Sequence, residues 1–385
     1  MSSTTASTTA SCNTFCRGPT IETVACLICA SRDSSHVWAW IAKDAFAVNL
    51  GMPGRRSRWV MCRSCGLVFQ NPRPTLDETA RLYAGEVYRK ELSDAVVDER
   101  MEYFLRRPLN ALAWLYDQPE FAERFGHGRG GKALDIGSGW GGALLRLKER
   151  GWEPYGVEPD PRCAEYANGR FGVPTRAEFL TEATWPDVAF SFVFSQHAFE
   201  HMLDPLAVAR VARRLLDRED GLLFVCVPTY RRTGTYAWSY FNTAHTYMFT
   251  HRTLGNLLAR AGFRVLRHRY FTKWDREGEV WVLAGIDRSR GATGVPLPYH
   301  DVRWRRQLEL ALVPLTAVAG TLWRAVFATW LLLTRPTEFF ATSSRLKLLF
   351  TDRELLRRKA ARKLRNAATR FRLQFTRAKR LERPS

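Results

Sequence analysis

The sequence predicts an α/β protein built on a Rossmann-like, doubly wound sheet. A short apolar strand runs into a turn with glycines at alternate positions, Gly137, Gly139 and Gly141, and a helix-forming run follows at once. An acidic residue, Glu158, closes the next strand. Apolar strands then alternate with helical runs up to residue 286, which is typical of an open sheet with helices on both faces.

The glycine turn is typical of a site for a nucleotide-type cofactor. Glycines at this spacing let the backbone turn tightly and let a ligand approach the main chain. The helix expected from Ala143 to Lys148 presents unpaired N–H groups to the polar end of such a ligand. Asp135 stands before the first glycine, and Ser138 lies inside the turn. Doubly wound sheets bind their ligands at such a strand–helix crossing.

The later elements follow in the order that this sheet requires. The segment 188–194 is apolar nearly throughout, which is typical of a buried parallel strand. Gly262 ends the last expected helix. Strands are also expected at 154–159, 222–227, 263–270 and 279–286, and helices at 206–216 and 250–261.

The order Asp-x-Gly-x-Gly-x-Gly, with Glu158 placed 23 residues after Asp135, resembles class I S-adenosylmethionine-dependent methyltransferases. The resemblance covers residues 130–286 and implies a seven-stranded methyltransferase sheet with an antiparallel last strand. It implies that the glycine loop cradles the methionine part of the cofactor and that Glu158 holds the ribose hydroxyls. A dinucleotide dehydrogenase is the alternative, but its Gly-x-Gly-x-x-Gly fingerprint has a different spacing.

A polar cluster follows the 188–194 strand, and it resembles the fourth-strand region of many small-molecule methyltransferases. Ser195 and Gln196 are expected beside the cofactor, and Glu178, after the third strand, is the nearest match for an acid at the adenine. A histidine can take up a proton near neutral pH. The candidate bases are therefore the ionisable residues that come next, His197, Glu200 and His201. Bracing of the following helix is the alternative role for these residues.

A further candidate base, His245, lies in an insert after the 222–227 strand. Ligands meet the carboxyl ends of parallel strands, so the aromatic residues of the insert are expected to form a lid over a sugar or another ring. A helical packing surface is the alternative. The aromatic residues are Tyr230, Tyr236, Trp238, Tyr240, Phe241 and Tyr247.

Two Cys-x-x-Cys pairs lie upstream, Cys26 with Cys29 and Cys62 with Cys65, with 32 residues between the pairs. Four thiolates with no other ligand type nearby are typical of a closed, structural zinc site, and two disulfides are the alternative. The gap is longer than usual, so a small sheet is expected inside it. Its apolar filling would come from Trp38, Trp40, Phe46, Val48 and Trp59.

The other four cysteines are not expected to bind zinc. Cys12 and Cys16 lie in or beside a Ser/Thr-rich leader, which is expected to be disordered. Cys163 and Cys226 stand alone in apolar surroundings and are expected to be buried.

Five segments are expected along the chain: a leader (1–20), a zinc-binding domain (21–75), a helical linker (76–129), the methyltransferase domain (130–286) and a basic C-terminal extension (287–385). This order resembles methyltransferases with an N-terminal zinc-binding domain, some of which act on sugars or in polysaccharide or natural-product pathways. The resemblance implies a small-molecule or saccharide acceptor. The alternatives are an RNA or protein methyltransferase, and an inactive binding protein, against which the intact Asp135 and Glu158 argue.

The sequence pattern of the C-terminal extension predicts contact with a membrane. The net charge of the chain is +20, and residues 335–385 carry 16 Lys/Arg against 4 Asp/Glu, or +12. The apolar stretch 308–333 is long enough for one bilayer crossing, but Arg324 near its middle is costly there. A basic amphipathic helix follows at 351–381.

An apolar stretch paired with such a helix is typical of peripheral attachment. We therefore expect a cytoplasmic protein that contacts the anionic inner face of the membrane. A solvated helix packed on the domain is the first alternative. Nucleic acid is a less favoured partner, since charge alone does not separate it from a membrane.

Overall fold

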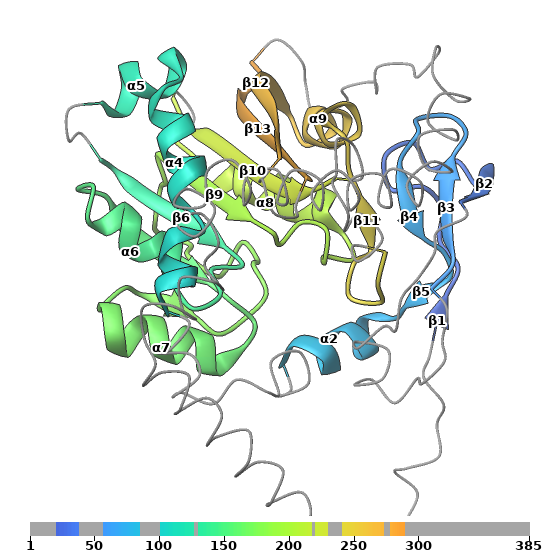
Figure 1. Ribbon diagram of the computed structural model, residues 1–385, viewed down its shortest axis with the longest axis horizontal. Helices are drawn as coiled ribbons and strands as arrows, with labels where there is room; N and C mark the ends of the chain where they lie inside the picture. Colours follow the sequence, from blue (N-terminus) through green and yellow to red (C-terminus); the bar gives the residue numbers. More distant parts are fainter. Residues whose placement is uncertain are drawn as a thin grey trace, which may run out of the picture. The chain divides into compact units, whose positions relative to one another are not determined.

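The computed structural model describes residues 21–37, 57–84, 101–126, 130–217, 220–229, 241–272 and 278–288 (Figure 1). The chain divides into two compact units, Met1–Val318 and Ala319–Ser385. The predicted apolar stretch and basic helix of the tail lie outside the described residues. Within the described ranges, no helix is long and apolar enough to cross a membrane.

The central element is a seven-stranded sheet in the order β12-β13-β10-β9-β6-β7-β8 (Figure 1). β13 is antiparallel to both of its neighbours, β10 and β12, while β9, β10, β6, β7 and β8 pair in parallel. This confirms the predicted doubly wound fold and its antiparallel last strand. The strands are β6 (Lys132–Ile136), β7 (Glu153–Val157), β8 (Thr175–Arg176), β9 (Phe192–Gln196), β10 (Leu222–Pro228), β12 (Phe263–Thr272) and β13 (Gly278–Ile286).

Helices pack against the sheet on both faces. Successive residues of a strand point to opposite faces, so Val193 of β9 belongs to one buried core and Phe192 and Phe194 belong to another. The first core includes residues of α8 and α9, and the second includes residues of α4, α5 and α6. The helices are α4 (Leu109–Tyr116), α5 (Pro119–Phe125), α6 (Gly142–Lys148), α7 (Pro161–Phe171), α8 (Pro205–Leu215) and α9 (His251–Arg260).

The segment 76–129, expected to be a helical linker, contributes to the core of the sheet. Leu112 and Trp114 of α4 and Phe121 of α5 are buried in the same cluster as Phe192 and Trp281. The indole of Trp114 lies 5.7 Å from that of Trp281, centroid to centroid. These two helices are therefore parts of the layer that covers one face of the sheet.

A second, four-stranded sheet has the order β11-β4-β3-β2. Cys62 lies in β3, and Cys26, Cys29 and Cys65 lie outside the strands. Three strands of this sheet come from the predicted zinc-binding segment, but β11 comes from the insert after β10 and pairs with β4. A two-stranded pair and one helix complete this part of the chain. The elements are β1 (Ile21–Glu22), β2 (Ser34–Val37), β3 (Trp59–Cys62), β4 (Val68–Gln70), β5 (Arg73–Pro74), α2 (Leu76–Ala84) and β11 (Tyr247–Met248).

This pairing overturns part of the predicted aromatic lid. The side chains of Phe241 and Tyr247 are buried, and the ring of Phe241 meets that of Trp59 edge-on at 5.1 Å. These two rings are packing residues between the insert and the N-terminal sheet, but Tyr247 lies in a strand, so the expected alternative of a helical packing surface is wrong for it as well. Trp59 is buried as expected. The other aromatic residues of the insert, and Trp38, Trp40, Phe46 and Val48, lie outside the described residues.

Candidate functional site

The glycine loop between β6 and α6 has the backbone that its sequence predicts. Gly137, Gly139 and Gly141 have φ values of 74°, 53° and 78°, a left-handed region that residues with a Cβ rarely adopt. A Cβ on Gly137 would lie 2.5 Å from the Cβ of Ala198. A Cβ on Gly142 would lie 2.3 Å from the backbone oxygen of Phe104. The loop therefore lies directly against the segment after β9 and against residues 101–106.

Glu158, just after β7, reaches into this loop. Its carboxylate accepts a hydrogen bond from the N–H of Gly139 at 2.8 Å and another from the N–H of Asp160 at 3.1 Å. A carboxylate is an acceptor-only group with about four acceptor positions. The loop and Glu158 thus fit a cofactor that presents hydroxyl groups, such as those of a ribose.

Asp135, in β6, and Ser138, in the loop, are both buried. Burial raises the pKa of Asp135 well above its usual range, and the nearby charge of Glu158 adds to this. The hydroxyl of Ser138 is buried and has no hydrogen-bond partner among the described residues. It is therefore available to a polar group of a bound cofactor.

The remaining predicted cofactor residues lie at the carboxyl edge of the sheet. The hydroxyl of Ser195 donates to the backbone oxygen of Ile136 at 3.0 Å, which joins the end of β9 to the end of β6. The amide of Gln196 lies 3.8 Å from the sulfur of Cys226. Glu178 is exposed in a bend just beyond β8. Their contacts with a cofactor stay predictions.

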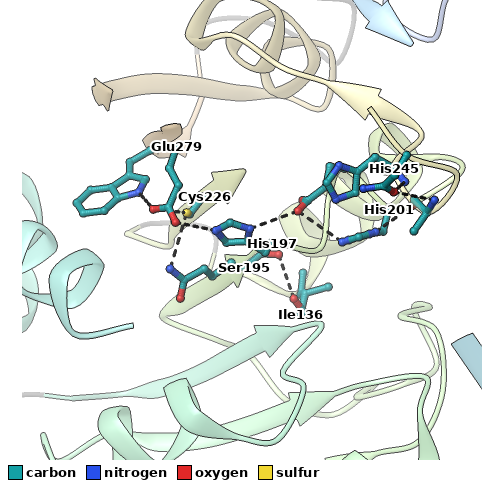
Figure 2. Close-up of polar contacts among 12 residues, drawn as sticks. Ile136, Ser195, His197, His201, Cys226, His245 and Glu279 are labelled. Carbon is teal, nitrogen blue, oxygen red and sulfur yellow. Dashed lines mark hydrogen bonds and ion pairs between the residues drawn. The ribbon is translucent and has the colours of Figure 1, made fainter. Parts of the chain in front are cut away.

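The first part of the polar cluster joins His197 to β10 and β13 (Figure 2). The Nε2 atom of His197 lies 2.8 Å from a carboxylate oxygen of Glu279. The other oxygen of Glu279 accepts from the indole N–H of Trp281 at 2.8 Å and from the thiol of Cys226 at 3.5 Å. Glu279 therefore fixes the ring of His197.

The second part of the cluster brings Glu200, His201 and His245 together. The Nε2 atom of His201 lies 3.6 Å from a carboxylate oxygen of Glu200. Its Nδ1 atom lies 2.7 Å from the hydroxyl of Tyr83 and 3.0 Å from the backbone oxygen of Ala244. The rings of His201 and His245 meet edge-on, with centroids 4.6 Å apart. The four predicted ionisable residues are thus gathered at one place.

Burial controls the charge of this cluster. It raises the pKa of Glu200 to about 8, although the positive charge of Arg107 acts in the opposite direction. Burial, with His245 close by, holds the pKa of His201 well below its usual range. Near neutral pH, His201 is therefore neutral and Glu200 is largely protonated, as expected when the charged forms are poorly solvated.

Three members of the cluster were not predicted from the sequence. Glu279 is an acid at the start of an otherwise apolar strand, and that contrast was a usable signal. Tyr83 follows from no local pattern, because it reaches His201 across 118 positions of sequence. Arg107 lies in the segment predicted to be a linker.

The four predicted cysteines also come together. The sulfurs of Cys26 and Cys65 are 3.4 Å apart, as are those of Cys29 and Cys62, and all four lie within 4.8 Å of one another. A disulfide would bring two sulfurs to about 2.05 Å, so the disulfide alternative is wrong for these thiols. Cys163 and Cys226 are buried, as predicted. Cys12 and Cys16 lie outside the described residues.

The two cysteine pairs have matching backbones. The N–H of Ala30 donates to the oxygen of Cys26, and the N–H of Gly66 donates to the oxygen of Cys62. Ala30 and Gly66 both have positive φ values, 58° and 74°. Two such turns facing each other point four sulfurs at one centre, which fits the tetrahedral coordination of zinc.

Comparison with known proteins finds one matching family model. Residues 97–268 match the model of a methyltransferase domain family. No curated protein matches the chain significantly. Among solved structures, 1,6-didemethyltoxoflavin-N1-methyltransferase from Burkholderia thailandensis, with bound 1,6-didemethyltoxoflavin and S-adenosylhomocysteine, is 20% identical. That match covers 57% of this chain and 96% of the other, with a TM-score of 0.42.

Two further solved structures match the chain with similarly low sequence identities and TM-scores. A SAM-dependent methyltransferase from Aquifex aeolicus is 21% identical, covering 45% of this chain and 90% of the other with a TM-score of 0.34. One from Archaeoglobus fulgidus is 16% identical, covering 48% and 93% with a TM-score of 0.38.

Together, the strand order, the glycine loop with its acidic partner and the family match define residues 97–268 as a methyltransferase domain. The fold and the family match together support methyl transfer as the activity of this domain.

Replacing Gly137 with alanine is expected to weaken the binding of S-adenosylmethionine at least tenfold. The new Cβ would meet Ala198, and the positive φ at this position disfavours alanine by about 1 kcal/mol or more. Isothermal calorimetry of the two proteins measures the change. Gly169→Ala, where a Cβ meets nothing within 4 Å, is the matched variant. Equal affinities in all three proteins would contradict the assigned position of the loop.

Proposed function

We propose that the enzyme methylates a small-molecule or saccharide-type acceptor at the polar cluster beside the glycine loop. The observation that supports this most is the place of the cluster. Ser195, two residues before His197, is hydrogen-bonded to the end of β6, and Ala198 touches the glycine loop. The acceptor atom would therefore meet these ionisable groups close to the cofactor.

The burial of the cluster supports a small reacting group. The side chains of His197 and His201 are 9% and 14% exposed, and that of Glu200 is fully buried. A single hydroxyl or amine can reach such groups more easily than a folded macromolecule can. S-adenosylmethionine supplies the methyl group as a sulfonium, so the protein has to position the acceptor and remove its proton.

We also propose that Cys26, Cys29, Cys62 and Cys65 hold a structural zinc ion, and that the module around it supports the cluster. The side-chain amide of Gln70, in β4, donates to the backbone oxygens of Asn242 at 3.3 Å and His245 at 3.4 Å. The N–H of Gln70 donates to the oxygen of Thr246. The module thereby fixes the backbone that carries His245.

The acceptor class is tested by methyl transfer from isotopically labelled S-adenosylmethionine. Purified enzyme is incubated separately with a low-mass metabolite extract, a polysaccharide and nucleotide-sugar fraction, total RNA and total protein. Label is expected in the first or second fraction. Label confined to RNA or protein would overturn the proposal in favour of the macromolecular alternatives. No label in any fraction, despite cofactor binding, would favour the inactive binding protein.

The tail leads to a separate proposal, that the enzyme is attached to the anionic cytoplasmic face of a membrane. Full-length protein is expected to sediment with anionic liposomes, and a version ending at Asp301 is expected to stay in the supernatant, because two anchoring signals are lost together. Full-length protein that ignores these liposomes at low salt would contradict the proposal. Release by high salt alone would show that the contact is purely electrostatic.

A further inference from the structure

The carboxylate of Glu200 is buried without the hydrogen bonds that such a group usually forms. It is fully buried, and neither of its oxygens has a hydrogen-bond partner among the described residues. A buried carboxylate left in this way is costly unless a proton, a donor or a cation fills its acceptor positions. The guanidinium of Arg107 acts on it through charge but forms no hydrogen bond to it.

Two imidazoles converge on the same point. One ligand atom each from Glu200, His201 and His245 lies within 4.8 Å of the others, and the Nε2 atom of His201 is 3.6 Å from Glu200. These atoms are close enough for one ion to bind all three after small adjustments. The set joins the segment after β9 to the insert that ends in β11 (Figure 2).

The ring of His201 already has the support that metal-binding histidines need. The backbone oxygen of Ala244, 3.0 Å from Nδ1, can only accept a hydrogen bond, so Nδ1 carries the proton. The hydroxyl of Tyr83 holds the same edge of the ring. The lone pair of Nε2 then faces Glu200. Histidine ligands of metals are generally fixed in this way through their other ring nitrogen.

The charges around the site favour a cation. Glu200 and Glu279 each bring a carboxylate, and Arg107 brings one positive charge. The charges of Glu279 and Arg107 both act on the carboxylate of Glu200. When an ion displaces the proton of Glu200, the two carboxylates and the guanidinium carry a net charge of about −1. A divalent ion would offset this charge and fill the acceptor positions of Glu200 at the same time.

We propose that Glu200, His201 and His245 form a second metal site, which binds a first-row divalent ion beside the glycine loop. Two imidazoles, one carboxylate and no thiolate suit such ions, and three protein ligands leave open positions for a substrate. This inference rests on the proposed function, because the open positions are assigned to a hydroxyl of the acceptor.

The ion would help to remove the proton from the hydroxyl of the acceptor. A bound metal lowers the pKa of an oxygen acid by many units, as it does for water. The acceptor hydroxyl loses its proton to solvent, and its oxygen attacks the methyl carbon while the carbon–sulfur bond breaks. The products are a methyl ether and the neutral thioether S-adenosylhomocysteine. The acceptor class is therefore a hydroxyl-bearing small molecule or saccharide.

The test uses the full-length chain with zinc already bound and Co²⁺ as the probe. Calorimetry and visible absorption are expected to show one Co²⁺ per chain, without a thiolate-to-cobalt charge-transfer band. Glu200→Gln and His245→Gln are expected to weaken binding about 100-fold or more, and Tyr83→Phe about tenfold, because the Tyr83 hydroxyl only orients the ring of His201. His251→Ala should bind Co²⁺ like the wild type, because the ring of His251 packs on His268 instead.

The outcomes separate this proposal from the proposed function. The second site is overturned if folded wild-type protein binds no Co²⁺ beyond the thiolate site, or if both glutamine variants, shown to be folded by their melting curves, bind it normally. Methylation of a small acceptor with no second metal would leave the proposed function intact. Bound Co²⁺ with label transferred only to RNA or protein would keep the site and overturn the acceptor class.

Discussion

Replacement of Cys62 with serine is expected to remove the zinc ion and most of the methyl-transfer activity, while S-adenosylmethionine still binds. Binding of a structural zinc contributes about 10–16 kcal/mol to the folding of such small modules. The variant keeps only three thiolates, so we expect the N-terminal sheet to lose its folded structure. The contacts from Gln70 to the backbone around His245 are then lost. The contact between Glu158 and Gly139 lies in the methyltransferase sheet and should remain.

Elemental analysis, calorimetry with S-adenosylmethionine and turnover are measured on the same preparations. Cys163→Ala is the matched variant, because Cys163 is a buried cysteine outside the cluster. It should keep one zinc per chain at the thiolate site. Zinc that persists in Cys62→Ser but is lost when Cys12 or Cys16 is replaced would show that the wrong thiols have been assigned.

Replacement of His201 with alanine is expected to lower kcat by about 10²- to 10⁴-fold, the usual range for a group that handles the reacting proton. The neutral ring of His201 lies between Glu200 and the pair formed by Tyr83 and Ala244. The loss should occur whether His201 takes the proton itself or binds an ion that lowers the pKa of the acceptor. Cofactor affinity should change little.

Single-turnover rates at saturating cofactor, together with melting temperatures, measure this effect. His251→Ala removes a histidine of the same type from α9 and should keep a nearly normal rate. If His201→Ala lowers the melting temperature but leaves turnover within a few-fold of the wild type, then His201 merely braces the helix that follows. That was the structural alternative considered from the sequence.

The parts of the fold that the sequence predicted correctly depend on local patterns. The glycine loop, Glu158 and the buried strands each have a signature within a few residues, because backbone geometry and burial restrict the residue types at those positions. The gathering of four cysteines was likewise predictable from two Cys-x-x-Cys pairs. Three members of the polar cluster, His197, Glu200 and His201, were predicted because they directly follow one strand in the sequence.

The parts that were missed depend on long-range pairing. β11 joins the N-terminal sheet from about 180 residues away, and no pattern in the insert distinguishes that strand from an aromatic lid. The contact of Tyr83 with His201 likewise depends on how α2 and β9 are placed by the fold. Burial of Phe241 against Trp59 follows only once that pairing is known.

Calorimetry of S-adenosylmethionine binding to the wild type and to Glu158→Ala tests the central claim most directly, since the proposed methyl transfer depends on this cofactor site. The wild type should bind one S-adenosylmethionine per chain and no NAD⁺. The variant should lose about 1.5–3 kcal/mol for each charged hydrogen bond removed, while Glu165→Ala, an exposed change on α7, should bind normally. Unchanged affinity in Glu158→Ala, or tight binding of NAD⁺ by the wild type, would contradict the account.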